Sequence, residues 1–188
     1  MKITALSENY VCKKGLNSEH GLSLLIETGD KKILFDMGQG DVFFKNANSL
    51  NVDLAQVDVA VLSHGHYDHG GGVKCFLENN MKAYVYVNEN AFGKFYSKNG
   101  YIGLDNKLMF NQRIRLISDT TEIFPFAKLV PAKDVPVSGD NYSYGLEKEL
   151  SQKRVPDDFL HEQYLLLEDN GKKYLFSGCS HRGVLNIM

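Results

Sequence analysis

The run Ser63–Gly72 reads SHGHYDHGGG and holds three of the six histidines of this 188-residue chain, together with one carboxylate. It directly follows Val57–Leu62, a largely apolar stretch that predicts a buried strand. A loop at the end of such a strand can direct several short side chains at one point, and imidazole and carboxylate groups suit zinc, iron or manganese. A solvated polar loop is the alternative, but the density of ligand-type side chains favours a metal site. The fold must therefore bring further ligands to this loop.

Length and composition predict a single globular domain, with 43% hydrophobic and 23% charged residues. The net charge is −2 and no block of basic residues is present, so neither nucleic acid nor an anionic membrane is expected as the main partner. The segment Met1–Asn9 lacks the apolar core of a signal peptide, and no run approaches the ~20 apolar residues of a membrane span. We therefore expect a cytoplasmic protein.

The three cysteines are odd in number and far apart, which argues against a disulfide framework. Cys12 and Cys75 are predicted to be small apolar core fillers. Cys179 stands two residues before His181, which places it near any metal that His181 binds and leaves both roles open, ligand and bystander.

Two β-hairpins with similar sequences are predicted far apart in the chain. His20–Phe35 reads HGLSLLIETGDKKILF, with a turn at Thr28–Asp30, and His161–Phe176 reads HEQYLLLEDNGKKYLF, with a turn at Asn170–Gly171. About half of the positions are identical at an offset of 141 residues. Hairpins resemble one another because turn chemistry limits their sequences, but identities on both strands favour a structural repeat.

Strands and helices alternate over the first ~130 residues, which predicts an α/β layered fold. The expected elements are a helix after Asp41, a helix from Val73, a strand over Ala83–Val87, a weakly patterned helix over 88–98, and strands over 113–118 and 122–130. The pattern breaks down over 131–160, a stretch that we interpret as an excursion over an active site rather than a disordered insert. The single domain, residues 1–188, would thus comprise a first half (about 1–130), the excursion, and the start of a second half (about 161–188).

The spacing within the histidine-rich run divides its ligands between two positions. His64 and His66, two residues apart, can share one ion, whereas Asp68 and His69 turn toward a second position. A third ligand of the first ion must come from a distant segment. His181 is the candidate, because its segment follows the second hairpin as Asp36 follows the first. A surface histidine is the alternative interpretation.

Five stretches together resemble a known family: Glu19–Ser23, Leu34–Gly38, Leu62–Gly71, Asp158–Gln163 and Gly178–Gly183. The chain resembles the metallo-β-lactamase superfamily, and within it the metal-dependent hydrolases that include dihydropterin-ribofuranosylaminobenzene-phosphate synthase-like proteins. The resemblance implies an αββα sandwich of two similar halves, in agreement with the repeated hairpin.

The resemblance also implies roles for individual residues. It makes one metal site from His64, His66 and His181, and a second from Asp68 and His69. Asp36 would orient a ligand histidine from outside the coordination sphere, with a plain turn residue as the alternative. The implied cofactor is zinc, one or two ions, with iron or manganese as alternatives. His20 and His161 occupy equivalent repeat positions and are not expected to be ligands; His20 would line the pocket.

The implied activity is metal-dependent hydrolysis of a small, anionic ester or phosphoester. Metal-activated water would attack the substrate, and Asp68 would orient that water and handle its proton. Arg182 either holds an anionic group of the substrate or is solvent-exposed. A pterin-related synthase or lyase is an alternative from the same resemblance.

Family members continue beyond the position of Met188, so the resemblance predicts an incomplete second half without the last histidine of the second metal site. A second alternative therefore follows: a truncated, catalytically impaired metal-binding protein stabilised by self-association or by a complementing chain. Two ions per chain with turnover would favour the enzyme, and one ion or none without turnover would favour the remnant.

Overall fold

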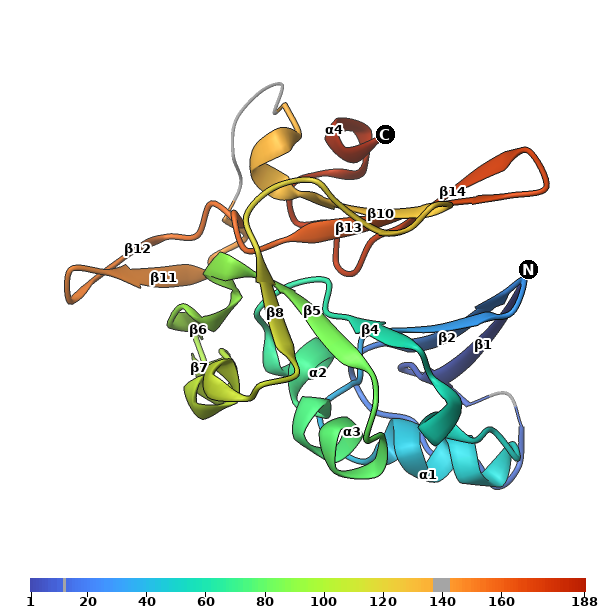
Figure 1. Cartoon of the computed structure of the whole chain (residues 1–188). Coiled ribbons are helices and arrows are strands. Elements are labelled where there is room, and N and C mark those ends of the chain that lie inside the picture. Colours follow the sequence, from blue (N-terminus) through green and yellow to red (C-terminus); the bar gives the residue numbers. More distant parts are fainter. Residues whose placement is uncertain (12, 137–142) are drawn as a thin grey trace.

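The computed structural model of the chain describes residues 1–11, 13–136 and 143–188 (Figure 1). Cys12 and part of the expected excursion therefore lie outside the described residues. The largest element is a six-stranded sheet with the order β1 (Lys2–Ser7), β2 (Ser23–Thr28), β3 (Lys31–Phe35), β4 (Val59–Val61), β5 (Tyr84–Asn88) and β8 (Ile114–Ile117). The pairs β1/β2 and β2/β3 are antiparallel, and the pairs from β3 to β8 are parallel.

Helices cover one face of this sheet. α1 (Val42–Ser49) and α3 (Val73–Asn79) lie below it in Figure 1, with the short α2 (Tyr67–Gly70) beside them. Both longer helices agree with the sequence expectation, and their apolar side chains enter a core whose fully buried members include Phe43, Ala47 and Phe76. Burial of these side chains supplies the main driving force that holds the helices on the sheet.

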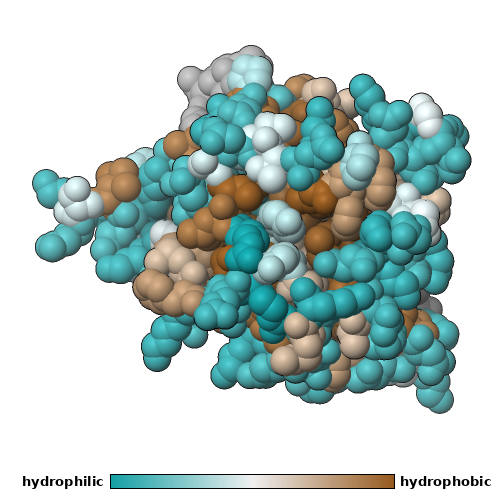
Figure 2. All heavy atoms as spheres, viewed as in Figure 1, coloured by the Kyte–Doolittle hydropathy of each residue, from teal (hydrophilic) through white to brown (hydrophobic). Residues whose placement is uncertain are grey.

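A second, antiparallel sheet packs on the opposite face. Its order is β14 (Lys172–Phe176), β13 (Gln163–Asp169), β10 (Ala127–Pro131) and β9 (Thr121–Phe124). The interlayer core joins Ile33, Phe35 and Val61 of the first sheet to Leu129 and Leu165 of the second. Figure 2 shows hydrophobic side chains along the seam between the layers on the face viewed in Figure 1. The short α4 (Val184–Ile187) lies on the outer side of the second sheet, so the layers run helix, sheet, sheet, helix.

The two predicted hairpins form with the same register. Leu24 pairs with Phe35 in β2/β3, and Leu165 pairs with Phe176 in β13/β14, as the offset of the repeat requires. At the second turn Asn170 and Gly171 both have positive φ, the conformation that two-residue hairpin turns need. The turn ends of the hairpins meet, because Thr28 Oγ1 donates a hydrogen bond of 2.8 Å to the carboxylate of Asp169.

Three sequence expectations need correction. The helix over 88–98 is wrong: a 3₁₀ turn at Glu89–Phe92 is followed by strand β6 (Phe95–Ser97), because the Asn88 side chain caps that turn and Gly93 ends it. The strand over 122–130 is wrong as one element, since it is the hairpin β9/β10. The expected excursion contains a further hairpin, β11 (Glu147–Leu150) and β12 (Lys153–Pro156).

The β11/β12 hairpin belongs to a small third sheet. Its order is β12, β11, β6 and β7 (Gly100–Tyr101), and the hairpin projects from the left of the molecule in Figure 1. Three further 3₁₀ turns complete the structure, at Leu54–Gln56, Asn106–Phe110 and Ala132–Asp134. Within the described ranges, no helix has the length and apolar character needed to span a membrane.

Candidate metal centre

The histidine-rich run lies where β4 ends, at the carboxyl edge of the parallel strands, and leads into α2. His64, His66 and His69 are all at least 96% buried, which is unusual for polar side chains. The backbone at Gly65 is packed so closely that a Cβ there would lie 2.3 Å from the carbonyl oxygen of Ala91. The loop is therefore held inside the molecule rather than solvated.

Three imidazoles converge at this point. The ring centroids of His64, His66 and His181 lie 4.6, 5.3 and 5.2 Å apart. The Nε2 atoms of all three are buried, and none has a hydrogen-bond partner among the described residues. A buried polar atom left without a partner costs free energy, so three at one place indicate a ligand that they would bind.

These three histidines are uncharged at neutral pH. Burial, reinforced by the neighbouring imidazoles, lowers the pKa of His66 to about 2 and that of His181 to about 4. The same causes hold the pKa of His64 well below its ordinary value of 6.5. Neutral imidazole offers a lone pair, which is the form that binds a metal ion.

Asp36 orients His64 through Ser63. The Asp36 carboxylate accepts hydrogen bonds from the backbone N–H and from the Oγ of Ser63, both at 2.7 Å, and Ser63 Oγ lies 2.8 Å from His64 Nδ1. Because the Ser63 hydroxyl donates to Asp36, it accepts from His64, which places the proton on Nδ1 and leaves Nε2 free. Asp36 is held there in a left-handed conformation, φ 60°.

Asp36 also contacts His69, whose Nδ1 lies 2.7 Å from Oδ2 of the carboxylate. Burial alone would lower the pKa of His69, but the charge of Asp36 and the nearby Cys179 outweigh it and hold this pKa well above 6.5. The other nitrogen, Nε2, lies 3.2 Å from Sγ of Cys179. A metal ion bound at Nε2 would replace the proton on that nitrogen. The Nδ1–H group would still donate its hydrogen bond to Asp36.

The ligand-type atoms form overlapping groups whose members lie within 4.8 Å of one another. One group is His64, Cys179 and His181, and a second is His64, Asp68 and His69. These two groups hold four of the five residues predicted to bind metal: His64, Asp68, His69 and His181. The fifth, His66, is placed in a third such group with Asp157 and His161, and its ring centroid lies 4.6 Å from that of His64.

His181 is positioned by Glu162 and Phe159. The buried Glu162 carboxylate accepts hydrogen bonds from the backbone N–H groups of His181 (2.8 Å) and Arg182 (3.2 Å), and from the hydroxyl of Tyr164 (2.8 Å). Burial raises the pKa of Glu162, although these hydrogen bonds act to lower it. The imidazole of His181 stacks on Phe159 with ring centroids 4.4 Å apart. The loop after β14 is therefore fixed at both backbone and side chain.

Arg182 does not point its guanidinium at an open site. It is 92% buried, and its terminal nitrogens donate to the backbone carbonyls of Asp158 and Val135. The interpretation of Arg182 as a solvent-exposed residue is wrong, and this arrangement gives it a structural use in tying the loop to the segment before β13.

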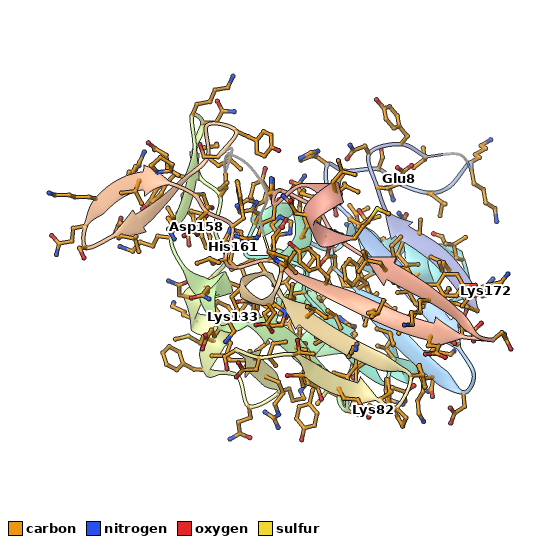
Figure 3. The ribbon with its side chains drawn as sticks, turned by 90° about the horizontal axis from the view of Figure 1, so that it is seen from above. Glu8, Lys82, Lys133, Asp158, His161 and Lys172 are labelled. Carbon is orange, nitrogen blue, oxygen red and sulfur yellow. The ribbon has the colours of Figure 1, made fainter. Side chains whose placement is uncertain are left out.

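His161 differs from the three converging histidines, because both of its ring nitrogens have partners. Nδ1 accepts a hydrogen bond from the backbone N–H of Gly65 (3.0 Å), and Nε2 donates to Asp157 (3.1 Å). Figure 3 labels His161 in the interior, beside Asp158 at the base of the β11/β12 hairpin. The ring also packs on Phe95, with centroids 4.0 Å apart. His161 thus supports the loop that carries His64 and His66.

Comparison with known proteins identifies the family. The sequence profile of the metallo-beta-lactamase superfamily matches residues 17–184. The chain belongs to the metallo-β-lactamase superfamily. This confirms the family and the α/β fold predicted from the sequence, and the superfamily is one of metal-dependent hydrolases.

Individual relatives agree with this membership of the metallo-β-lactamase superfamily. An uncharacterized protein of Methanocaldococcus jannaschii is 34% identical over 197 residues, covering 99% of this chain and 72% of that protein. The 7,8-dihydropterin-6-methyl-4-(beta-D-ribofuranosyl)-aminobenzene-5'-phosphate synthase of the same organism is 26% identical over 214 residues, covering 100% and 70%. The crystal structure of Tm1679, a metal-dependent hydrolase of the β-lactamase superfamily, matches with a TM-score of 0.83 at 33% identity, covering 98% and 68%.

The residues present fit the metal ion that the metallo-β-lactamase superfamily implies. Three buried, uncharged imidazoles present nitrogen atoms that lack partners in the described part of the chain, and carboxylate, imidazole and thiol groups stand beside them. This donor set suits zinc and also admits iron or manganese.

Sequence reasoning missed three residues that support the candidate metal centre. Ser63 directly precedes the histidine run, and its place between a strand and a ligand was the available signal. Glu162 and Gln163 stand at the start of β13, where two polar residues before an apolar run were the signal. Gln163 is fully buried and donates to the carbonyls of Leu62 (2.7 Å) and Tyr86 (3.1 Å), which ties the second hairpin to the first sheet.

Proposed function

We propose that this chain is a metal-dependent hydrolase that acts on a small, anionic ester or phosphoester, with an ion held by His64, His66 and His181. The observation that carries the proposal is the convergence of three imidazole rings whose buried Nε2 atoms lack hydrogen-bond partners within the described residues. Zinc is the ion we expect, with iron or manganese as alternatives.

A bound divalent ion would supply Lewis-acid chemistry, which lowers the pKa of water and polarises the oxygen under attack. Asp68 is the residue that we assign to the proton of that water. Its Oδ2 lies 3.7 Å from His69 Nε2, and its side chain is 11% exposed, toward the cleft beside the centre. A carboxylate in this place can orient a water molecule and accept its proton.

The cleft beside the centre has a volume of about 260 Å³. Its lining includes Asp68, His69 and Cys179, so that a substrate in it would lie against the carboxylate to which we assign the proton of the water. Its size suits a small molecule.

The similarity to the synthase of Methanocaldococcus jannaschii supports an anionic substrate, because the name of that protein includes a 5'-phosphate. The same similarity favours the second candidate, a pterin-related synthase or lyase. The two differ in the bond that is made or broken, so the products distinguish them: a hydrolase adds water to its substrate, and a synthase does not.

The experiment combines metal analysis with turnover. The full chain is loaded with zinc, its metal content and solution mass are measured, and a panel of ester, phosphomonoester and phosphodiester substrates is assayed. We expect at least one ion per chain and hydrolysis of one substrate class. His66→Ala should lose both the ion and turnover, and Asp68→Asn should lose turnover, since the amide cannot take a proton.

Tyr67→Phe is the matched control, because Tyr67 is exposed and stands between His66 and Asp68 in the sequence. Its metal content and turnover should equal those of the parent. A chain that binds no ion would overturn the proposal. A chain that binds the ion and turns over nothing on the panel would favour the metal-binding remnant, and its solution mass would test the expected self-association.

A further inference from the structure

We propose that the outer face of the second sheet, beside α4, is an interface at which a second copy of this chain docks. The surface, called the leucine face below, consists of Leu166 and Leu175 on the sheet and of Val184, Leu185 and Met188 beside them. Neither the metal ion nor the proposed hydrolysis is needed for this contact.

The strand register places the apolar side chains of the sheet on one face. Leu166 of β13 pairs with Leu175 of β14, and Tyr164, two residues before Leu166, pairs with Val130 of β10. Side chains alternate along a strand, and the sequence neighbours of these residues lie in the interlayer core, so all four point to the outer side. Ile187 of α4 packs against the cluster that contains Tyr164. α4 therefore covers only one end of this face, which is seen from above in Figure 3.

The repeated hairpin shows what the leucine face lacks. At the offset of 141 residues, Leu166 and Leu175 correspond to Leu25 and Leu34, which form the same cross-strand pair on β2 and β3. Leu25 and Leu34 are at most 1% exposed, in the core to which α1 contributes Phe43. Leu166 is only half-buried, and Leu175 is 41% exposed. A helix thus covers the leucine pair of the first half and leaves the pair of the second half open.

α4 has the complementary deficiency. It follows β14 as α1 follows β3, and its second residue is Leu185, where α1 has Phe43. Phe43 is fully buried, whereas Leu185 is 90% exposed and so has little contact with its own chain. Val184 and Met188 are also exposed. Protruding apolar side chains beside an open apolar pair are typical of a protein–protein contact.

A second copy of the chain supplies both missing parts at once. Around a two-fold axis, Leu185 of each copy would lie on Leu166 and Leu175 of the other. Such an interface is isologous, because the same surface of both copies takes part and each contact occurs twice. Each leucine pair then receives the apolar cover that α1 provides in the first half of the chain.

The charges around the leucine face favour the same occupant. On the outer side of the sheet Glu122 pairs with Lys128, and Glu168 pairs with Lys173. Both signs are therefore present in equal number. A strongly acidic or basic partner would find no field of opposite sign here, whereas an identical surface matches these charges with its own. Apolar residues at the centre and charged residues at the rim are the usual arrangement of an interface.

The experiment is the solution mass of the full chain, measured with a chelator by light scattering and sedimentation over a concentration series. The parent should have the mass of two chains of 21.2 kDa. Leu185→Asp and Leu175→Arg each place a charge in the apolar contact, so each should raise the dissociation constant of the dimer by about tenfold or more. Because both side chains are exposed in the single chain, each variant should fold, which thermal unfolding verifies.

The double variant Leu185→Asp/Leu175→Arg tests which residues meet. If Leu185 of one copy lies on Leu175 of the other, the two new charges attract each other twice per dimer, and part of the lost affinity should return. The matched control is Phe110→Asp. Phe110 is 80% exposed and borders the cavity beside α3, on the helix-covered side of the first sheet, so this variant should remain dimeric.

A parent that stays monomeric over the whole series, which would leave the leucine face to a different polypeptide, would overturn the proposal. A dimer that both single variants leave unchanged would overturn it as well. A double variant no more dimeric than the single variants would refute the contact between Leu185 and Leu175. Since the chelator keeps the chain free of metal, none of these outcomes bears on the proposed function.

Discussion

The buried imidazoles of the candidate centre predict that the metal-free protein loses stability as the pH falls below 6.5. In the folded chain, burial lowers the pKa of His66 to about 2 and that of His181 to about 4. In the unfolded chain both groups titrate near the ordinary value of about 6.5. The unfolded state therefore binds more protons in this window, and protonation favours unfolding. The window runs from 6.5 down to about 4 for His181, and down to about 2 for His66.

The magnitude follows from proton linkage. Between pH 6.5 and about pH 5, each of the two histidines lowers the free energy of unfolding by about 1.5 kcal/mol, or about 3 kcal/mol together. His64 acts in the same direction, because burial also lowers its pKa. Since single domains are stable by only about 5–15 kcal/mol, a loss of this size is readily measured.

Two other groups act with the opposite sign. His69, whose pKa is raised in spite of its burial, adds stability that is fully present below 6.5 and is lost as the pH rises through its folded pKa. It therefore contributes no slope below 6.5. Burial raises the pKa of Glu162, so its ionised form destabilises the folded chain. Protonation of Glu162 as the pH falls removes this cost and offsets part of the stability lost through the histidines.

The assay is urea unfolding of the full chain with a chelator, at pH 6.5 and at about pH 5. The free energy of unfolding of His181→Gln and of His66→Gln should each fall by about 1.5 kcal/mol less than that of the parent over this interval. Because the parent and both variants contain Glu162, its contribution cancels in this comparison. Equal losses for the parent and both buried-site variants would refute the reasoning.

Three further predictions concern support of the centre and of the core. Asp36→Asn, which removes the carboxylate that orients two histidines, should weaken metal binding by about 10–100-fold in competition with a chromophoric chelator. Gly178→Ala would place a Cβ 2.3 Å from Ser63 Oγ; it should weaken metal binding and cost about 1–3 kcal/mol in urea unfolding. Leu129→Ala, at a fully buried interlayer position, should cost about 2–5 kcal/mol, whereas Leu150→Ala, at a half-exposed one, should cost little; equal costs would contradict the assigned core.

The parts of the fold that the sequence predicts correctly are those fixed by local chemistry. Apolar runs on both sides of glycine-containing turns specify the hairpins β2/β3 and β13/β14, because turn geometry sets the register of a two-residue hairpin. The helices α1 and α3 follow from apolar residues at helical spacing. The repeat then relates the segment of His181 to that of Asp36 without any knowledge of tertiary structure.

The parts that escape prediction depend on partners distant in sequence. No residue of the β11 and β12 strands is fully buried, so the strands lack the alternation that marks a half-buried strand, and the pairing of β11 with β6 supplies the missing constraint. The hairpin β9/β10 is read as one strand because Pro125 and Phe126 form a turn without glycine. The sequence does not distinguish Gln163 from an exposed polar residue, because the carbonyls to which it donates belong to residues distant in sequence.

The distinction between His161 and His181 shows what sequence pattern leaves open and hydrogen bonding decides. His161 is buried and His181 is half-buried, and both lie in stretches that resemble the superfamily. His161 stands just before the β13/β14 hairpin, and His181 follows it. Gly65 and Asp157 occupy the two nitrogens of His161, whereas the buried Nε2 of His181 has no partner among the residues described. A histidine whose nitrogens are both engaged stabilises the loop, and a histidine with a free, neutral nitrogen is the one available to a metal ion. The residues around each ring, rather than its position in the repeat, therefore assign its role.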